Sequence, residues 1–154
     1  MSDKKISILY VDDEENNLFS FKATFRIKYQ VFTAISGDEA LEIMEKKSIN
    51  IIITDQRMPN MTGVEFLEKV IEKFPDPIRI LLTGYADMGA VVDAVNKGKI
   101  FHYLSKPWNE EELDMTILRA YSAYQEKEKL KEMNEKLGIS NDQLEFMLRQ
   151  KLLS

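Results

Sequence analysis

The sequence predicts an α/β fold in which a five-stranded parallel sheet is covered by helices on both faces. Short apolar runs alternate along the chain with longer stretches whose apolar residues recur at helical spacing. Several runs are apolar almost without interruption, which is typical of parallel strands buried on both faces. The alternation repeats five times before residue 122, and this favours a sheet with helices packed on each side.

Five strands are expected, one at each apolar run: Ile6–Val11, Val31–Ile35, Ile51–Thr54, Ile78–Leu82 and Phe101–Leu104. The amphipathic stretches that follow predict helices over Leu18–Ile27, Glu39–Met44, Val64–Ile71 and Val91–Val95, and a fifth helix that begins near Glu110. Right-handed crossovers leave few possible strand orders. We expect the flavodoxin-like order 2-1-3-4-5.

Helix starts are marked by a capping residue with an acidic residue three positions later. The pairs are Ser36 with Glu39, Thr62 with Glu65, and Asn109 with Glu112. Asp87 is the expected cap of the fourth helix, and Gly98 is its expected stop.

The last part of the chain differs in composition, so we expect a core domain over residues 4–121 and a helical extension over 122–154. The fifth helix is predicted to continue to Gly138, and a second helix starts at the Ser140 and Gln143 signal. The apolar residues of that helix form one stripe: Leu144, Met147, Leu148 and Leu152. The extension either folds onto its own domain or serves as a dimerising or relay helix. Three leucines seven residues apart are too few to establish a coiled coil.

Composition excludes several kinds of protein. Hydrophobic residues make up 44% and charged residues 31% of the 154 residues, and no apolar run approaches the roughly 20 residues that span a bilayer. The sequence contains no cysteine, which excludes disulfides, thiolate zinc sites and a cysteine nucleophile. The net charge of −5 gives no indication of nucleic-acid binding. We expect a cytoplasmic protein that does not associate with membranes, and no direct nucleic-acid contact by this segment.

Polar residues gather where four of the predicted strands end. Asp12 and Asp13 follow the first strand, Asp55 the third, Thr83 the fourth and Lys106 the fifth. Ligands of open parallel sheets bind beyond these carboxyl ends. Each residue alone has an ordinary explanation as a turn, a cap or a surface group, but their joint placement indicates a site.

The three aspartates would repel one another, and a hard divalent cation would relieve that repulsion. Oxygen ligands suit Mg²⁺, whereas a rim with no histidine argues against zinc. Lys106 and the Thr83 hydroxyl suit phosphate oxygens. A carboxylate can act as the nucleophile in phosphoryl transfer, and Asp55 at the tip of its apolar strand is the best placed.

Four segments carry a resemblance to a known family: Val11–Glu14, Thr54–Gly63, Leu82–Gly84 and Tyr103–Pro107. With these residues the sequence resembles the receiver domain of two-component response regulators, from residue 4 to about residue 121. The surrounding residues resemble the receivers of hydrogenase-type regulators and of cyclic-dinucleotide phosphodiesterases. One departure is the connection from Gly98 to Tyr103, which looks one residue longer than in many receivers and would introduce a bulge.

The resemblance implies a role for each matching residue. Asp55 would be the phosphoacceptor, and Mg²⁺ would be held by Asp12, Asp13, Asp55 and the main-chain carbonyl of Arg57. Thr83, Tyr103 and Lys106 would be the switch hydroxyl, the switch aromatic and the phosphate-binding lysine. Tyr103 has the alternative of a half-buried core residue.

The resemblance also implies partners. A sensor histidine kinase or a phosphotransfer protein would donate the phosphoryl group. An output domain or partner would use the face formed by the fourth helix, the fifth strand and the fifth helix, and phosphorylation would produce a homodimer there. Beyond accepting and slowly losing its own phosphoryl group, such a domain is not an enzyme.

Three further expectations concern single residues near this rim. Arg57 and Tyr85 lie where they would shield an acyl phosphate from water. His102, the single histidine, is expected to face outward from its strand.

Two other functions remain open. The chain is alternatively an interaction module that has kept the fold without phosphorylation, although Asp13, Asp55, Thr83 and Lys106 argue against this. An aspartate-nucleophile phosphatase would need a second aspartate two residues after the nucleophile, where this sequence has Arg57.

Overall fold

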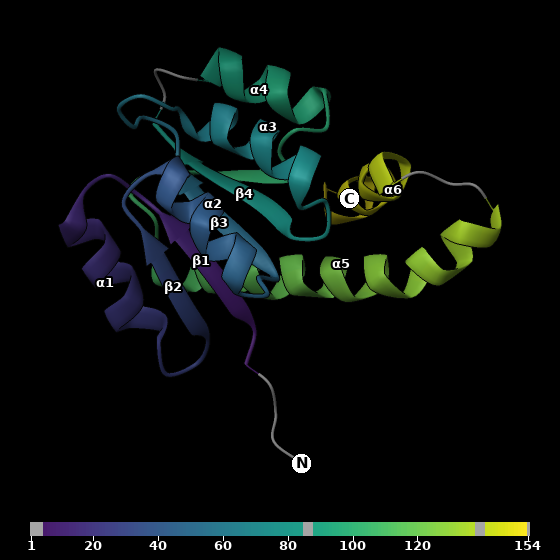
Figure 1. Cartoon of the computed structure of the whole chain (residues 1–154), viewed down its shortest axis with the longest axis horizontal. Coiled ribbons are helices and arrows are strands. Elements are labelled where there is room, and N and C mark those ends of the chain that lie inside the picture. Colours follow the sequence, from purple (N-terminus) through teal and green to yellow (C-terminus); the bar gives the residue numbers. More distant parts are fainter. Residues whose placement is uncertain (1–4, 85–87, 138–140, 154) are drawn as a thin grey trace.

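The computed structural model describes residues 5–84, 88–137 and 141–153 and contains the expected parallel sheet (Figure 1). The strand order β2-β1-β3-β4-β5 confirms the predicted fold class. The strands are β1 (Ser7–Val11), β2 (Gln30–Ala34), β3 (Ile51–Asp55), β4 (Ile78–Thr83) and β5 (His102–Ser105). Every neighbouring pair is parallel, so all five carboxyl ends lie on one rim of the sheet.

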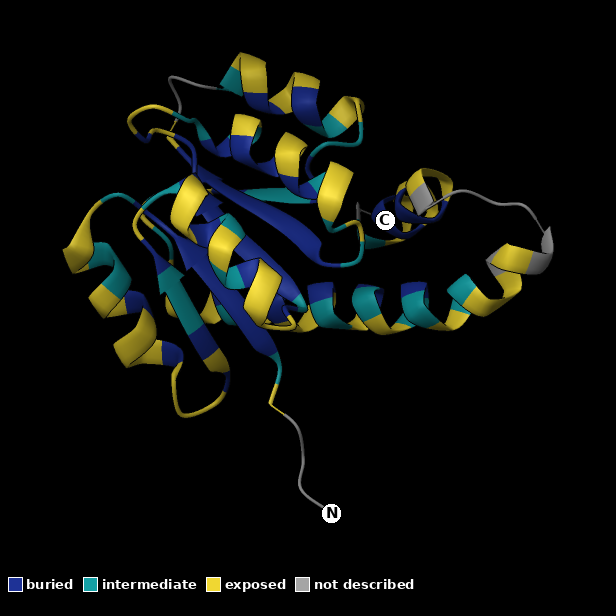
Figure 2. Ribbon diagram, viewed as in Figure 1, coloured by how far each residue is buried: buried dark blue, intermediate teal, exposed yellow. Residues whose placement is uncertain are grey.

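Helices cover both faces of the sheet and enclose two separate apolar cores (Figures 1 and 2). On one face α1 (Glu15–Phe25) and α5 (Glu110–Leu137) pack on the side chains represented by Ile8, Ile51 and Ile80. The other face carries α2 (Gly37–Lys46), α3 (Gly63–Lys73) and α4 (Met88–Asn96). Strands β1, β3 and β4 are buried along their whole length between the two helix layers, as is typical of parallel strands.

The predicted cap residues form the expected hydrogen bonds. The Thr62 hydroxyl accepts from the Glu65 amide while the Glu65 carboxylate accepts from the Thr62 amide, a complete capping box. The Ser36 hydroxyl and the Asn109 amide oxygen each accept from the amide three residues on. These caps fix the starts of three helices and with them the loops that precede those helices.

Some helix boundaries differ from the prediction. Helix α1 begins at Glu15 rather than Leu18, because its first turn, Glu15–Asn17, is polar and adds nothing to the apolar pattern. Gly98 has a φ of 77° and ends the α4 segment as predicted. The expected cap Asp87, the stop Gly138 and the start residue Ser140 lie outside the described residues.

The connection between α4 and β5 is the segment whose length departs from the family pattern. Ile100 and Phe101 are both fully buried, one in each of the two cores. From His102 to Ser105 the strand pairs with β4 in continuous register, so the expected bulge is not observed in these residues.

The extension forms two helices, of which the second folds back onto the domain (Figure 1). Helix α5 has 28 residues, or about 42 Å at the usual rise, and it continues without a break past residue 121. Helix α6 (Asn141–Leu153) places Leu144 and Leu148 in buried positions. Met147, which spacing places on the same apolar stripe, is 55% exposed. Among the described helices, none is both long and apolar enough to cross a membrane.

Candidate functional site

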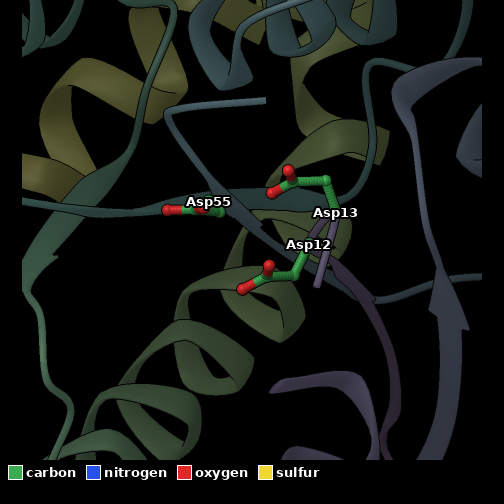
Figure 3. A group of neighbouring side chains, drawn as sticks. All are labelled: Asp12, Asp13 and Asp55. Atoms are coloured by element: carbon green, nitrogen blue, oxygen red, sulfur yellow. The ribbon is translucent and has the colours of Figure 1, made fainter. Parts of the chain in front are cut away.

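Three carboxylates meet at the carboxyl-end rim of the sheet (Figure 3). Asp12 and Asp13 follow β1, and Asp55 ends the adjacent strand β3. One carboxylate oxygen of each lies within 4.8 Å of the others. Asp12 and Asp55 are buried and Asp13 is half-buried, so the group is shielded on one side and open on the other.

Asp55 is held in one orientation by two hydrogen bonds. Its Oδ1 accepts from the Lys106 ammonium at 3.0 Å and from the Gln56 amide at 3.0 Å. Burial raises the pKa of the Asp55 carboxyl, and the nearby Asp12 adds to this effect against the opposing influence of Lys106. The carboxylate is thus less stable in its charged form than an exposed aspartate, and a cation beside it would restore the balance.

Lys106 and Thr83 complete the rim. Burial by itself would lower the pKa of the Lys106 ammonium, but its hydrogen bond and ion pair with Asp55 raise it overall. Lys106 therefore stays charged near neutral pH. The buried Thr83 hydroxyl donates to the neighbouring Gly84 carbonyl at 3.0 Å. Backbone pairing of Lys106 with Thr83 keeps the two residues adjacent.

Asp12 has a set of hydrogen-bond donors that the sequence did not indicate. Its Oδ1 accepts from the Glu14 amide at 2.9 Å, and its Oδ2 accepts from the Asn17 amide group at 3.1 Å and the Tyr10 hydroxyl at 3.4 Å. These donors fix the orientation of the Asp12 carboxylate at the rim. Of these donors, only Tyr10 is fully buried.

Tyr10 links the acidic group to an aromatic cluster beneath it. Its ring stacks on Phe21 at 4.1 Å, and Trp108 packs on Phe21 and Phe25 at 6.1 and 5.8 Å. Two aromatic residues of α1 four positions apart, Phe21 and Phe25, were the available signal for this cluster.

The loop between Asp55 and α3 is held in place by hydrogen bonds of Gln56, which lies in the segment that carries the family resemblance. The Gln56 carbonyl accepts from the Gly63 amide, and the Gln56 side chain accepts from the Val64 amide, both at 2.9 Å. Asn60 has a left-handed φ of 70°, which asparagine tolerates better than most residues. These contacts bring the first turn of α3 directly behind Asp55.

The remaining predicted residues lie around this group. Tyr103 is half-buried against the core on the α4 face, and Arg57 has an exposed side chain two residues after Asp55. Tyr85 lies outside the described residues. His102 is half-buried rather than fully outward-facing, and burial lowers the pKa of its imidazole. The switch role of Tyr103 and the ligand role of the Arg57 carbonyl remain predictions.

The donor set fits a hard divalent cation. All three candidate ligands are carboxylates from adjacent strand ends, and a divalent cation among them would offset their mutual repulsion. Mg²⁺ is bound by such oxygen donors and keeps several waters, whereas zinc sites use histidine or cysteine.

Comparison with known proteins agrees with this arrangement. Residues 8–118 match the family described as response regulator receiver domain. The hydrogenase transcriptional regulatory protein HoxA of Cupriavidus necator is 38% identical over 123 residues, which are 80% of this chain and 26% of that protein. The chain thus spans about a quarter of the length of this curated relative.

Solved structures give the same result. A structure titled adenylate cyclase from Rhodopirellula baltica aligns with a TM-score of 0.82 and 31% identity, over 86% of this chain and 98% of that one. The signal receiver domain of an HD domain-containing protein from Pseudomonas fluorescens Pf-5 aligns with a TM-score of 0.77 and 28% identity, over 84% and 96% of the two chains.

Proposed function

This chain belongs to the response regulator receiver domain family of bacterial two-component systems, and we propose that it accepts a phosphoryl group on Asp55 and changes shape in response. The observation that supports this most directly is the convergence of three carboxylates with the Lys106 ammonium at one rim. Such a group can bind a cation and a phosphoryl group side by side, which is most of what this transfer requires.

Asp55 is the nucleophile in this proposal. Both of its hydrogen bonds to described residues go to Oδ1, so Oδ2 is the oxygen that attacks phosphorus. An O–P bond forms to Oδ2 as the N–P bond of a donor phosphohistidine breaks, and the histidine nitrogen keeps the bonding electrons. Small phosphodonors with a P–N bond would react in the same way.

Mg²⁺ is the cofactor we propose, held by Asp13, Asp55 and the Arg57 carbonyl, with Asp12 acting through water. When bound, it neutralises charge on the transferring phosphoryl oxygens. Lys106 turns from Asp55 to a phosphoryl oxygen. The Thr83 hydroxyl turns from the Gly84 carbonyl to another, and Tyr103 then packs into the space behind Thr83.

We propose a sensor histidine kinase or phosphotransfer protein as the donor, in the cytoplasm, and an output domain or partner as the receiver of the signal. The face made by α4, β5 and α5 carries exposed apolar side chains at Val92, Met115 and Leu118. These residues support a phosphorylation-linked homodimer through that face. Light scattering with and without a phosphoryl analogue tests it, and a monomer in both conditions rejects it.

Labelling with a radioactive small phosphodonor tests phosphorylation itself. The wild-type chain should take up label in the presence of Mg²⁺, lose it to hydroxylamine as an acyl phosphate does, and take up none in Asp55→Asn. Asp38→Asn, which changes an exposed aspartate in α2, is the control and should label normally. Equal labelling of Asp55→Asn contradicts the proposal, and no labelling of the wild type favours a phosphorylation-independent interaction module.

A further inference from the structure

Helix α6 is fastened to the domain by a buried group of charges. The two carboxylate oxygens of Glu145 pair separately with the Arg79 guanidinium of β4 and the Lys127 ammonium of α5. The three side chains are 6%, 2% and 1% exposed, respectively. Leu148 of the same helix joins the apolar core on the α5 face. Glu145 therefore connects three elements that are far apart in the sequence.

The cations of this group also hold the connection between α4 and β5. Arg79 donates to the carbonyls of Lys99 at 3.1 Å and Gly98 at 3.5 Å. From α6 itself, Arg149 donates to the Ile100 carbonyl at 3.4 Å. Three consecutive carbonyls of the connection are thus bound by side chains that belong to α6 or pair with it.

This connection and the start of β4 lie opposite the phosphoacceptor rim. Strand β4 runs from the Arg79 end to Thr83, and β5 runs from the connection to Ser105, next to Lys106. Helix α6 consequently contacts the start of β4 and, directly or through Arg79, the connection that leads into β5. At their other ends these two strands lead to the Thr83 hydroxyl and to Lys106. In Figure 1, α6 lies beside the end of β4 that is remote from the rim.

We propose that α6 is an intramolecular latch, closed in the unphosphorylated domain and loosened when Asp55 is phosphorylated. The inference rests on the proposed function. In the structure, where α6 is docked, Lys106 pairs with Asp55 and the Thr83 hydroxyl bonds to the Gly84 carbonyl. Both side chains must turn toward a bound phosphoryl group, and this displaces the ends of β4 and β5 that share strands with the α6 contacts.

The latch opens as a unit because its charges are buried. Withdrawing Glu145 leaves Arg79 and Lys127 as two buried cations without a carboxylate, and a buried charge that has lost its partner is strongly unfavourable. Partial withdrawal is therefore worse than either end state. Coupling between two such states is reciprocal, so opening α6 must also favour the phosphorylated arrangement.

Hydrogen exchange on the full chain with Mg²⁺ and beryllofluoride, a phosphoryl analogue, tests the latch. We expect the amides of α6 to exchange about tenfold faster with the analogue bound, within the usual range of coupling between sites, while those of β1 stay unchanged. Because linkage is reciprocal, Glu145→Gln should bind beryllofluoride several-fold more tightly than the wild type. The exchange measurement needs no substitution and remains decisive if Glu145→Gln fails to fold.

Glu126→Gln is the matched control, because Glu126 also joins α5 to α6 but through an exposed ion pair with Lys151 at 3.4 Å. Its analogue affinity should stay within twofold of the wild type. Analogue binding with unchanged α6 exchange, or with unchanged affinity in Glu145→Gln, overturns the latch and leaves the proposed function standing. Absence of Mg²⁺-dependent analogue binding to the wild type overturns both.

Discussion

Replacing Gly63 by alanine should displace Asp55, the proposed phosphoacceptor, through its main chain. A Cβ at this position would lie 2.4 Å from the Asp55 carbonyl oxygen and 2.7 Å from Leu81 Cδ1. Close carbon–oxygen contacts are usually about 3.3 Å or longer, so the methyl group would overlap the backbone by about 1 Å. Leu81 can rotate, but the Asp55 carbonyl belongs to a central strand and can move only with its own carboxylate.

The expected loss of stability follows from this overlap. Overpacking costs roughly 1–3 kcal/mol, and the helix preference of alanine returns less than about 1 kcal/mol. We expect Gly63→Ala to lower the free energy of unfolding by about 2 kcal/mol, near the middle of the overpacking range. Because a misplacement of about 1 Å can cost on the order of a hundredfold in rate, phosphorylation should slow by a similar factor.

Urea denaturation followed by the fluorescence of Trp108, the only tryptophan, measures the stability change, and labelling with a small phosphodonor measures the rate. Gly89→Ala in α4 is the control, since nothing lies within 4 Å of the added Cβ. It should match or slightly exceed wild-type stability. A Gly63→Ala chain with wild-type stability and labelling rate would refute the steric argument.

Three further predictions concern the aromatic cluster and the histidine. Tyr10→Phe keeps the ring but removes the hydrogen bond from the Tyr10 hydroxyl to Asp12, so urea denaturation should show a loss of stability of about 1 kcal/mol; an unchanged free energy of unfolding would contradict this. Phe21→Ala empties a fully buried position between stacked rings and should cost about 4 kcal/mol in urea denaturation; a loss below about 1 kcal/mol would mean the site collapses freely. Burial lowers the pKa of His102 from its ordinary 6.5, so the unfolded chain binds a proton that the folded chain resists. Stability should fall as the pH drops below 6.5, and His102→Gln should remove part of that fall; equal pH profiles would contradict it.

The sheet, its order and the rim of the site were predictable because each depends on local pattern. Apolar runs define buried strands, and parallel strands bring their carboxyl ends together whatever the loops do. This placed Asp55, Asp13 and Lys106 at one rim before any contact was known. Capping residues such as Thr62 act within one turn of helix, so the helix starts that they mark could also be predicted from the sequence.

Contacts between distant segments were not predictable in this way. Lys127 lies in the predicted helical extension, yet its side chain is 1% exposed and paired with Glu145. Met147 fitted the apolar stripe by spacing, but α6 is rotated so that Glu145 and Arg149 face inward beside Leu148. The spacing of apolar residues does not reveal a buried ion pair. In α6 the ion pairs of Glu145 determine which face of the helix packs on the domain.

The two ends of β4 carry unlike duties, and this separation has an evolutionary consequence. In the proposed function the Thr83 end takes part in phosphoryl transfer, while Arg79 at the other end pairs with Glu145 of the segment that follows the domain. A lineage could exchange that segment, and with it the charge at position 79, without altering the reaction. One strand would then let a fixed chemical input serve changing downstream architectures.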